Sequence, residues 1–255
     1  MVQQASQELL ELRHLEIIRG GRRVLCDIDL KVKQQEIIGI VGPNGAGKTT
    51  LMSAIAGQIK PAAGSILFRG QNISSWPPHR RCWAGIARTF QIPKPFPEMT
   101  AWENVAIGAW FGKTGRRRSI TRSRALKFLE MVGLPHKADT LGKELTLSEQ
   151  RRLEVARALA TQPQILLLDE VAAGLSPKMV SQVAKLVTRL RQKGVTLIII
   201  DHFLNLTLEV SDRLVVLDRG EKIMEGPPPV VIRHPEVVGA YLGTRRLLKS
   251  QEAES

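Results

Sequence analysis

Apolar residues recur along this chain with two different periods, and segments of the two kinds alternate. Residues 23–33 (RVLCDIDLKVK) alternate apolar and polar side chains, which predicts a strand with one buried face. Residues 177–192 place apolar side chains on one face of a helix. Four shorter runs are apolar almost throughout and predict buried strands: 36–41, 164–169, 195–201 and 213–218. Strands that alternate with helices predict a parallel α/β sheet.

The middle of the chain, from about residue 93 to 160, has a different character. Apolar residues fall at helical spacing in 125–132 and again in 151–160, with loops and prolines between them. This stretch interrupts the series of predicted strands. We therefore expect it to be a helical insertion into the sheet.

Four shorter segments complete the set of predicted elements. Residues 48–59 have a helix-forming composition and end just before a proline. Residues 65–69 and Ile73 predict a short strand and a turn. The run 226–229 (GPPP) predicts a sharp stop before a short helical segment at 235–248.

The composition excludes several classes of protein. The chain has 255 residues, of which 43% are apolar and 24% charged, and this ordinary globular composition argues against a disordered, collagen-like or coiled-coil protein. Two cysteines cannot form a disulfide framework, which suits a reducing cytosol. The apolar runs are only a few residues long and the start of the chain is polar. We therefore expect neither a membrane span nor a secretory signal.

The net charge is the unusual feature of the composition. The chain carries 37 basic and 24 acidic residues, a formal net charge of +13. Six basic residues lie within 113–124, with no acidic residue among them. Such an excess suits nucleic acid, an anionic membrane surface or a phosphorylated ligand. A solvated basic loop is the alternative interpretation of this run.

A glycine-rich motif follows the predicted strand 36–41. Residues 42–49 (GPNGAGKT) fit the phosphate-binding pattern G-x-x-x-x-G-K-[ST]. Glycines let backbone N–H groups close around phosphates, and the following helix directs its positive end at the same place. Lys48 would add a charge between the β- and γ-phosphates, and Thr49 would offer a hydroxyl to Mg²⁺. The residues predicted to bind the nucleotide here are Gly42, Pro43, Asn44, Gly45, Ala46, Gly47, Lys48, Thr49 and Thr50.

Two further apolar strands end in residues that suit phosphate chemistry. Residues 165–170 (ILLLDE) bring Asp169 to the carboxyl end of a strand, where ligands of open α/β sheets bind. Asp169 would hold Mg²⁺, and the adjacent Glu170 would polarise an attacking water as a general base. Residues 197–202 (LIIIDH) put His202 just past a strand end, which favours a contact with the γ-phosphate. A structural histidine in the core or on the surface is the alternative.

These motifs resemble those of the ATP-binding-cassette ATPases, and the resemblance extends from about residue 9 to 242. It implies a P-loop NTPase fold of the α/β class, with a RecA-like parallel-sheet core, an N-terminal antiparallel β part and an inserted α-helical subdomain. The expected organisation is a single domain over 9–243 with its helical subdomain at about 93–160, followed by a tail at 244–255. The expected cofactors are ATP and Mg²⁺.

The resemblance also assigns roles to residues outside the phosphate loop. It implies that Gln91 takes part in catalysis and in metal binding. Residues 145–149 (LTLSE) stand at the position of the family signature. The signature serves the ATP bound by the opposite subunit, so Thr146 and Ser148 would contact that nucleotide. Arg19 stands where the family stacks adenine on an aromatic residue, and a guanidinium can also stack on a base.

Several positions depart from the family pattern. Leu147, Ser148 and Glu149 stand where a glycine or aromatic residue, a glycine and a glutamine are usual. Ser148 adds a Cβ where a backbone should approach phosphate closely, and Glu149 adds negative charge near a polyanion. Val171 replaces a proline, for which we expect only a modest backbone effect. We therefore expect an asymmetric pair, in which this chain hydrolyses ATP against the normal signature of a paralogous partner.

A narrower resemblance is to the ATPase subunits of importers for branched-chain and other hydrophobic amino acids. It rests on 87–91 (ARTFQ), 96–100 (FPEMT), 103–105 (ENV) and 237–243 (VVGAYLG). It implies ATP hydrolysis that powers import of a small solute, at the cytoplasmic side of the inner membrane. The implied partners are transmembrane permease subunits, a paralogous ATPase subunit and, indirectly, a solute-binding protein.

The same motifs are also compatible with other functions. Similar ATPases serve urea or short-chain amide import, and a related one drives lipopolysaccharide export. A nucleic-acid-associated cassette protein is less consistent with a chain of 255 residues, which has room for one cassette, so we expect no nucleic-acid partner. A non-hydrolysing ATP sensor would lack the base, whereas Glu170 is present.

The segment 91–110 is rich in prolines and aromatic residues. In the family, a groove near the glutamine receives a short helix of the permease. Trp102 and Trp110 are interpreted as core residues, whereas Phe96 and Met99 are expected to make exposed contacts. The basic run that follows would then lie near anionic lipid headgroups.

Overall fold

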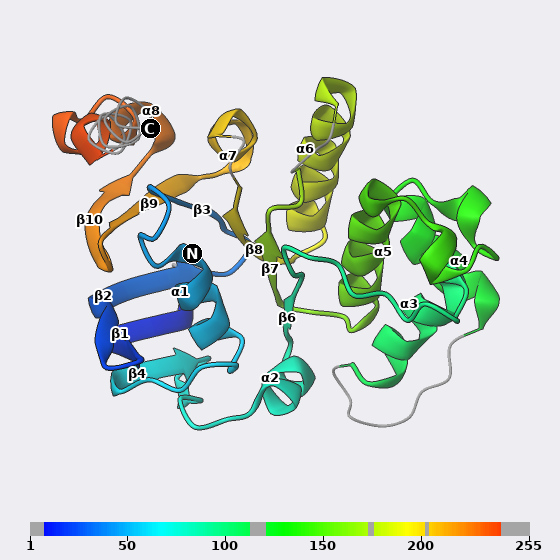
Figure 1. The fold of residues 1–255 in the computed structure, drawn as a ribbon, viewed down its shortest axis with the longest axis horizontal. Helices are drawn as coiled ribbons and strands as arrows, with labels where there is room; N and C mark the ends of the chain where they lie inside the picture. The colour runs from blue at the N-terminus through cyan, green and yellow to red at the C-terminus, as the bar shows by residue number, and fades with distance from the viewer. Residues whose placement is uncertain (1–7, 113–120, 173–175, 202–203, 241–255) are drawn as a thin grey trace, which may run out of the picture.

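The computed structural model describes residues 8–112, 121–172, 176–201 and 204–240. These residues form two sheets, with helices packed around them (Figure 1). The antiparallel sheet has the strand order β2-β1-β4-β5 and consists of β1 (Glu8–Arg19), β2 (Arg22–Lys33), β4 (Ala63–Phe68) and β5 (Gln71–Asn72). The core sheet has the order β10-β9-β3-β8-β7-β6 and consists of β3 (Ile37–Val41), β6 (Ile86–Arg88), β7 (Ile165–Asp169), β8 (Thr196–Ile200), β9 (Arg213–Asp218) and β10 (Glu221–Gly226).

The core sheet is parallel from β6 to β9, and β10 pairs antiparallel with β9. In the register of β7, Leu167 lies opposite Arg88 of β6, and Asp169 lies opposite Ile200 of β8. Parallel strands end at the same edge of a sheet. The segments that follow β3, β6, β7 and β8 therefore meet at one edge of the core sheet.

Helices surround the sheets, and α3, α4 and α5 come between β6 and β7 in the chain (Figure 1). The helices are α1 (Lys48–Ile55), α2 (Pro78–Ala84), α3 (Ala101–Trp110), α4 (Arg122–Met131), α5 (Leu147–Ala160), α6 (Pro177–Gln192), α7 (Leu204–Val210) and α8 (Pro228–Val231), with short 3₁₀ turns η1 (Pro135–Lys137) and η2 (Gly142–Glu144). None of the helices in the described ranges is both long enough and apolar enough to span a bilayer.

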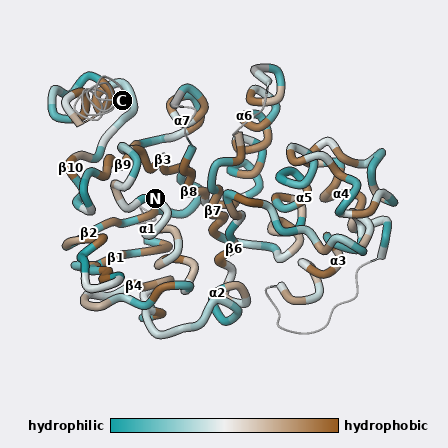
Figure 2. The backbone as a smooth tube through the Cα atoms, in the orientation of Figure 1, coloured by the Kyte–Doolittle hydropathy of each residue, from teal (hydrophilic) through white to brown (hydrophobic). Residues whose placement is uncertain are grey.

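The central strands of the core sheet consist mainly of hydrophobic residues, as Figure 2 shows by their brown colour, and apolar side chains pack against both faces of this sheet. Successive residues of a strand point to opposite faces. Leu167 and Ile198 therefore join the cluster that contains α1 and the antiparallel sheet, whereas Leu166 and Leu197 join the cluster that contains α3, α4, α5 and α6. Burial on both faces explains why β7 and β8 have continuous apolar sequences.

The predicted buried strands are confirmed as β3, β7, β8 and β9, and the alternating segment forms β2. Helix α6 has the bounds predicted for it, and α5 begins before residue 151, at Leu147. The predicted helix 48–59 is too long, because α1 ends at Ile55. The guanidinium of the buried Arg81 donates hydrogen bonds to the carbonyls of Ala54 and Ile55 at 2.6 and 2.9 Å, and these bonds satisfy the end of the helix.

Strand β1 was not among the elements that the pattern of apolar residues predicts. Its pairing with β2 shifts register between Leu12 and Leu15 and again between Leu15 and Ile17. Such bulges break the period of two that would identify a strand. The sharp stop predicted at 226–229 is also wrong in part, because Pro228 begins α8, a position at which the missing N–H is harmless. The chain is helical again over 235–240, and the rest of the predicted helix to 248 lies outside the described residues.

Candidate functional site

The glycine-rich loop connects β3 to α1 at the carboxyl edge of the core sheet. Gly42 has a φ of 146°, and a Cβ added there would lie 2.0 Å from the carbonyl oxygen of Leu217. Gly47 caps the N-terminus of α1 with a φ of 102°, and its Cβ would lie 2.6 Å from a methyl carbon of Leu25. Both positions therefore require glycine, and the loop is held tightly between β2 and β9.

Lys48 lies folded over this loop. Its Nζ donates hydrogen bonds to the carbonyl oxygens of Gly42 and Pro43 at 2.7 and 2.8 Å. Burial lowers the pKa of Lys48, and the negative charges of Glu170 and Asp169 oppose this shift. The lysine therefore lies near enough to both carboxylates at the end of β7 for their charges to act on it. Thr49, in the first turn of α1, is exposed.

Asp169 ends β7 in a nearly dry environment. Its Oδ2 accepts a hydrogen bond at 2.8 Å from the guanidinium of Arg88, and the two side chains are only 1% and 7% exposed. Its backbone N–H donates to Thr89 Oγ1 at 3.1 Å. The strand pairing explains the contact with Arg88, because Asp169 lies two residues past Leu167, the residue opposite Arg88.

Glu170 follows in a left-handed backbone conformation with a φ of 52°, and its N–H donates to the carbonyl of Ile200 on β8 at 2.8 Å. Gln91, which follows β6, donates from Nε2 to Glu170 Oε2 at 2.8 Å. The structure therefore brings Gln91, Glu170 and Asp169 together beside the phosphate loop. A carboxylate in this position can accept a proton from water, and the amide that bonds it can hold it in place.

The segments after β7 and β8 are linked to each other by Asp201, a residue that is not among the predicted site residues. Its Oδ2 accepts a hydrogen bond at 2.9 Å from the N–H of Ala172. An aspartate directly before His202, at the end of an apolar strand, is the sequence signal for such a link. His202 itself and residues 173–175 lie outside the described residues.

The family signature forms the start of α5. Thr146 is the N-cap of this helix, and it makes a complete capping box with Glu149. The Thr146 hydroxyl accepts from the N–H of Glu149 at 3.3 Å, and Glu149 Oε2 accepts from the Thr146 N–H at 2.9 Å and hydroxyl at 3.0 Å. The hydroxyl predicted to contact a nucleotide is therefore already engaged within the chain. The spacing T-x-x-E is the sequence signal for this box.

The other residues of the signature also differ from an open phosphate-binding turn. Leu147 is exposed, whereas Ser148 Oγ is buried and, among the described residues, has no hydrogen-bond partner. Lys137 Nζ lies 3.6 Å from Glu149 Oε1. Burial raises the pKa of Glu149, but the hydrogen bonds from Thr146 and nearby positive charges outweigh it, and the net shift is downward. Glu149 therefore stays ionised at neutral pH.

Arg19, the predicted adenine contact, lies at the end of β1 and is exposed. It pairs with Arg22 in the hairpin to β2, the strand whose Leu25 contacts the phosphate loop at Gly47. The residue is therefore on the strand pair that borders the loop. Within the described residues, no hydrogen bond or ion pair joins Arg19 to the other predicted site residues.

A cavity of about 360 Å³ opens beside Gln91, between α2, β6, α3 and α5. Phe90 and Phe96 line it, and Phe96 is 44% exposed, as expected. Glu154 of α5 accepts a hydrogen bond from the N–H of Phe90 at 3.0 Å, and burial raises the pKa of Glu154. The cavity therefore touches the segment that carries Gln91.

The aromatic residues around this cavity follow the predictions only in part. Trp102 packs against the helical core cluster, which agrees with its interpretation as a core residue. Trp110, predicted to be a core residue, is 39% exposed and stacks on the exposed Phe111 at a centroid distance of 6.1 Å. Trp110 ends α3, and this position leaves its ring on the surface. Met99 is half-buried.

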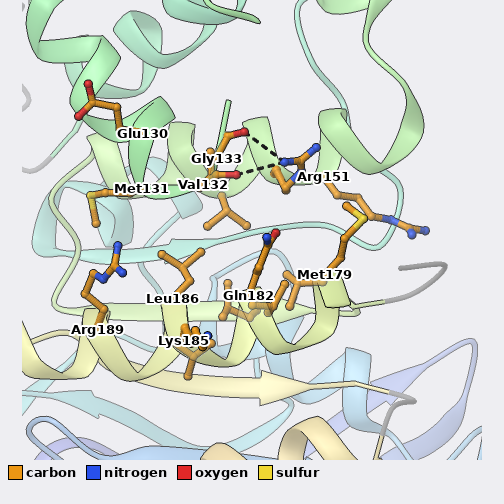
Figure 3. Close-up of a pocket in the computed structure, with 16 residues that line it drawn as sticks. Glu130, Met131, Val132, Gly133, Arg151, Met179, Gln182, Lys185, Leu186 and Arg189 are labelled. Carbon is orange, nitrogen blue, oxygen red and sulfur yellow. Dashed lines mark hydrogen bonds between the residues drawn. The ribbon is translucent and has the colours of Figure 1, made fainter. Parts of the chain in front are cut away.

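A second cavity, of about 230 Å³, lies between α5 and α6 (Figure 3). Gln182 and Leu186 line it from α6, and Leu168 and Val171, which flank the Asp169–Glu170 pair, also border it. Arg152 of α5 donates long hydrogen bonds to the carbonyls of Val132 and Gly133 at 3.4 and 3.3 Å, drawn as dashed lines in Figure 3. These contacts join α5 to the end of α4.

Comparison with known proteins relates this geometry to a family. The profile of the ABC transporter family matches residues 25–173. The chain is 37% identical to LivG of Escherichia coli strain K12, a high-affinity branched-chain amino acid transport ATP-binding protein, over 93% of this chain and 99% of that protein. It is 38% identical to LptB of Haemophilus influenzae, a lipopolysaccharide export system ATP-binding protein, over 88% of this chain and 92% of that protein.

Solved structures give the same result. A crystal structure of an ATP-binding cassette of an ABC transporter, in its ADP conformation, superposes with a TM-score of 0.82 at 32% identity. The match covers 92% of this chain and 99% of that one. The predicted α/β fold of the P-loop NTPases is thereby confirmed. The chain belongs to the ABC transporter family, as a subunit that binds and hydrolyses ATP and works with transmembrane permease partners.

Proposed function

We propose that this chain hydrolyses ATP to power the import of branched-chain or other hydrophobic amino acids. The observation that carries the proposal is the meeting of the phosphate loop, Asp169, Glu170 and Gln91 at one edge of the core sheet. The solute is supported by the likeness to LivG, which extends over almost the whole length of both proteins. We assign the subunit to the cytoplasmic side of the inner membrane, as part of a complex with its permease.

The residues at this edge suit Mg²⁺ together with the phosphates of ATP. Thr49, Gln91 and Asp169 offer hydroxyl, amide and carboxylate oxygens, and Mg²⁺ prefers such hard oxygen ligands. Asp169 ends β7, and Lys48 begins α1 just after β3, at the same edge of the core sheet, as a shared phosphate and metal site requires. Bound Mg²⁺ would neutralise charge on the β- and γ-phosphates.

The chain's own groups would first bind the phosphates and then activate the attacking water. The N–H groups of the loop and the N-terminus of α1 bind the phosphates, and Lys48 moves from the carbonyls of Gly42 and Pro43 to the β- and γ-phosphates. Glu170 accepts the proton of the attacking water as general base. We assign His202 to the γ-phosphate and Arg19 to the adenine. Gln91 holds Glu170 through its amide N–H, and its amide oxygen would be a ligand for Mg²⁺.

We also propose that the chain pairs with a paralogous ATPase whose signature is of the usual kind. Thr146 and Ser148 would face the ATP of that partner, but their hydroxyls are engaged and buried, respectively. Glu149 adds negative charge at the same place. The nucleotide that faces this signature would therefore turn over more slowly than the one bound by this chain. A solute-binding protein would deliver the amino acid on the other side of the membrane.

The cavity beside Gln91 is where we expect the permease to dock. Phe90 and Phe96 give it an apolar lining, and the Phe90 N–H is held by Glu154 of α5. A helix seated there would press on the segment that carries Gln91. Movement of this segment would shift Glu170 through the Gln91–Glu170 hydrogen bond.

The first test is ATP turnover by the purified chain beside a Glu170→Gln variant. Loss of the base is expected to lower turnover by about 10²–10⁴-fold, with binding of ATP retained. Turnover that persists in the variant would exclude Glu170 as the base. Uptake of radiolabelled leucine or urea by the reconstituted complex then separates the amino-acid importer from the amide importer.

A further inference from the structure

Arg88 is the last residue of β6, and it lies where this strand, the end of β7 and helix α1 come together. It lies opposite Leu167 in the parallel pair β6–β7, and Asp169 follows two residues later on β7. Residues two apart on a strand share a face. Arg88 and Asp169 therefore project from the same face of the core sheet, the face against which α1 packs.

The guanidinium of Arg88 donates hydrogen bonds both to the end of β7 and to residues in and just after α1. Its Nη2 donates to Asp169 Oδ2 at 2.8 Å, and its Nη1 donates to Ser53 Oγ at 2.8 Å and to Gln58 Oε1 at 2.6 Å. The Ser53 hydroxyl in turn donates to the carbonyl oxygen of Thr49, one turn earlier in α1, at 2.7 Å. One buried side chain thus connects the end of β7 with the first turn of α1.

The two residues that Arg88 connects are both assigned to Mg²⁺. Asp169 is bonded to Arg88 directly, through its carboxylate. Thr49 is bonded through Ser53 by its backbone carbonyl, which fixes the first turn of α1, the turn that carries the Thr49 hydroxyl. Groups that hydrogen-bond to metal ligands orient them and typically change metal affinity 10- to 100-fold when removed. The planar guanidinium is suited to this role, because it offers several donors in a rigid arrangement, which the single ammonium of lysine does not.

We propose that Arg88 is a positioning residue that sets the placement of Asp169 relative to Thr49, so that both reach the same Mg²⁺ ion. The inference deepens the proposed function and rests on its assignment of Thr49 and Asp169 to the metal. Arg88 does not touch the nucleotide in this scheme. Its effect is on the free energy by which Mg²⁺ strengthens ATP binding.

The test measures the affinity for a fluorescent ATP analogue, first in EDTA and then in excess Mg²⁺. All proteins carry Glu170→Gln to prevent hydrolysis. In Arg88→Met the affinity in EDTA is expected to change less than about twofold, while the gain on adding Mg²⁺ falls about tenfold. Arg88→Lys keeps the charge but not the geometry of the guanidinium. Its gain in affinity on adding Mg²⁺ is expected to fall about threefold, which is half of the tenfold fall on a logarithmic scale.

Two further variants separate the contacts of Arg88. Ser53→Ala removes only the link to α1, and its Mg²⁺ gain is expected to fall about three- to fivefold. Arg122→Gln is the matched control, because it removes an arginine from the exposed ion pair with Asp139. Its Mg²⁺ gain is expected to equal that of the wild type.

An Asp169→Asn variant distinguishes failure of this inference from failure of the proposed function. If Asp169→Asn keeps the full Mg²⁺ gain, the assignment of Asp169 is wrong and the inference falls with it. If Asp169→Asn loses the gain while folded Arg88→Met keeps it, the inference alone is wrong. If Arg88→Met does not fold, the comparison of Ser53→Ala with Arg122→Gln decides, since equal gains in these two would overturn the role of Arg88.

Discussion

Two helix N-termini of this chain are assigned to phosphate, and they are built in opposite ways. Helix α1 begins after Gly47, and within the described residues no side chain caps its first turn. Helix α5 begins after Thr146, which forms a capping box with Glu149 in both directions. The first turn of α1 contains a lysine and two threonines, whereas that of α5 contains the carboxylate of Glu149.

The difference shows what an anion site at a helix start requires. The first N–H groups of a helix lack partners within the helix, and they bind an anion if nothing else satisfies them. In α1 these groups and the positive end of the helix remain available to phosphate. In α5 the box satisfies two N–H groups and adds a negative charge. The two helix starts thus differ in whether the ligand or the chain itself satisfies their first N–H groups.

Among the changes to these two helix starts, the largest expected effect comes from adding a methyl group to the phosphate loop before α1. In Gly42→Ala the new Cβ would lie 2.0 Å from the carbonyl oxygen of Leu217, so the loop or β9 must move. We expect a loss of about 1–3 kcal/mol in the free energy of unfolding and at least a tenfold loss of ATP affinity, on the order of 1.4 kcal/mol. Chemical denaturation and equilibrium titration with a fluorescent ATP analogue measure the two quantities.

Gly45→Ala is the matched control within the same loop. Gly45 also has a positive φ, 81°, but a Cβ there would meet nothing within 4 Å. Only the left-handed backbone is then penalised, by roughly 1–2 kcal/mol. Equal losses of affinity in the two variants would contradict the argument that close packing against β9 shapes the loop.

The open site could be predicted almost completely from the sequence, because its residues are contiguous or end apolar strands. Residues 42–49 and the Asp169–Glu170 pair are recognisable by pattern, and parallel strands necessarily bring their carboxyl ends together. The capping box at the start of α5 is also recognisable from the sequence, by the spacing T-x-x-E. The family pattern fits the same residues and predicts a weakened signature there, whereas the capping pattern predicts the observed box.

Contacts between distant residues could not be predicted in the same way. Arg88 and Asp169 are 81 positions apart, and their ion pair depends on the register of β6 against β7. Arg81 donates hydrogen bonds to carbonyls at the end of α1, which lie 26 and 27 positions earlier in the chain. Nothing in the local sequence indicates that this arginine is fully buried. Strand β1 was missed for a local reason, since its bulges interrupt the alternation of apolar residues.

A smaller effect is expected from opening the helix start of α5. Glu149→Gln keeps a side chain that can complete the box but removes its charge. We expect turnover at the nucleotide that faces this signature to rise about two- to fivefold, as removal of about 0.3–1 kcal/mol of repulsion implies. Single-turnover measurements on the assembled ATPase pair, with one nucleotide site blocked at a time, report this rate.

Glu149→Ala separates the charge from the cap. It removes the box as well as the carboxylate, and we expect it to lower the free energy of unfolding by about 1 kcal/mol. Its turnover should rise less than that of Glu149→Gln, because the helix start also loses order. Equal rates at the two sites of the wild-type pair would contradict the asymmetry from which both expectations follow.

The smallest effect is a pH dependence of the same box. Burial would raise the pKa of Glu149, but hydrogen bonds from Thr146 and the charges of Lys137 and Arg152 hold it below its ordinary value of 4.5. A carboxyl whose pKa is lower in the folded chain stabilises that chain above its unfolded pKa, and the stabilisation disappears as the pH falls through the lowered value. The difference in unfolding free energy between the wild type and Glu149→Ala should therefore be full at pH 7 and begin to shrink below about pH 4.5. Denaturation curves at a series of pH values measure it, and a difference that grew toward acid pH would mean that the carboxylate strains the helix start.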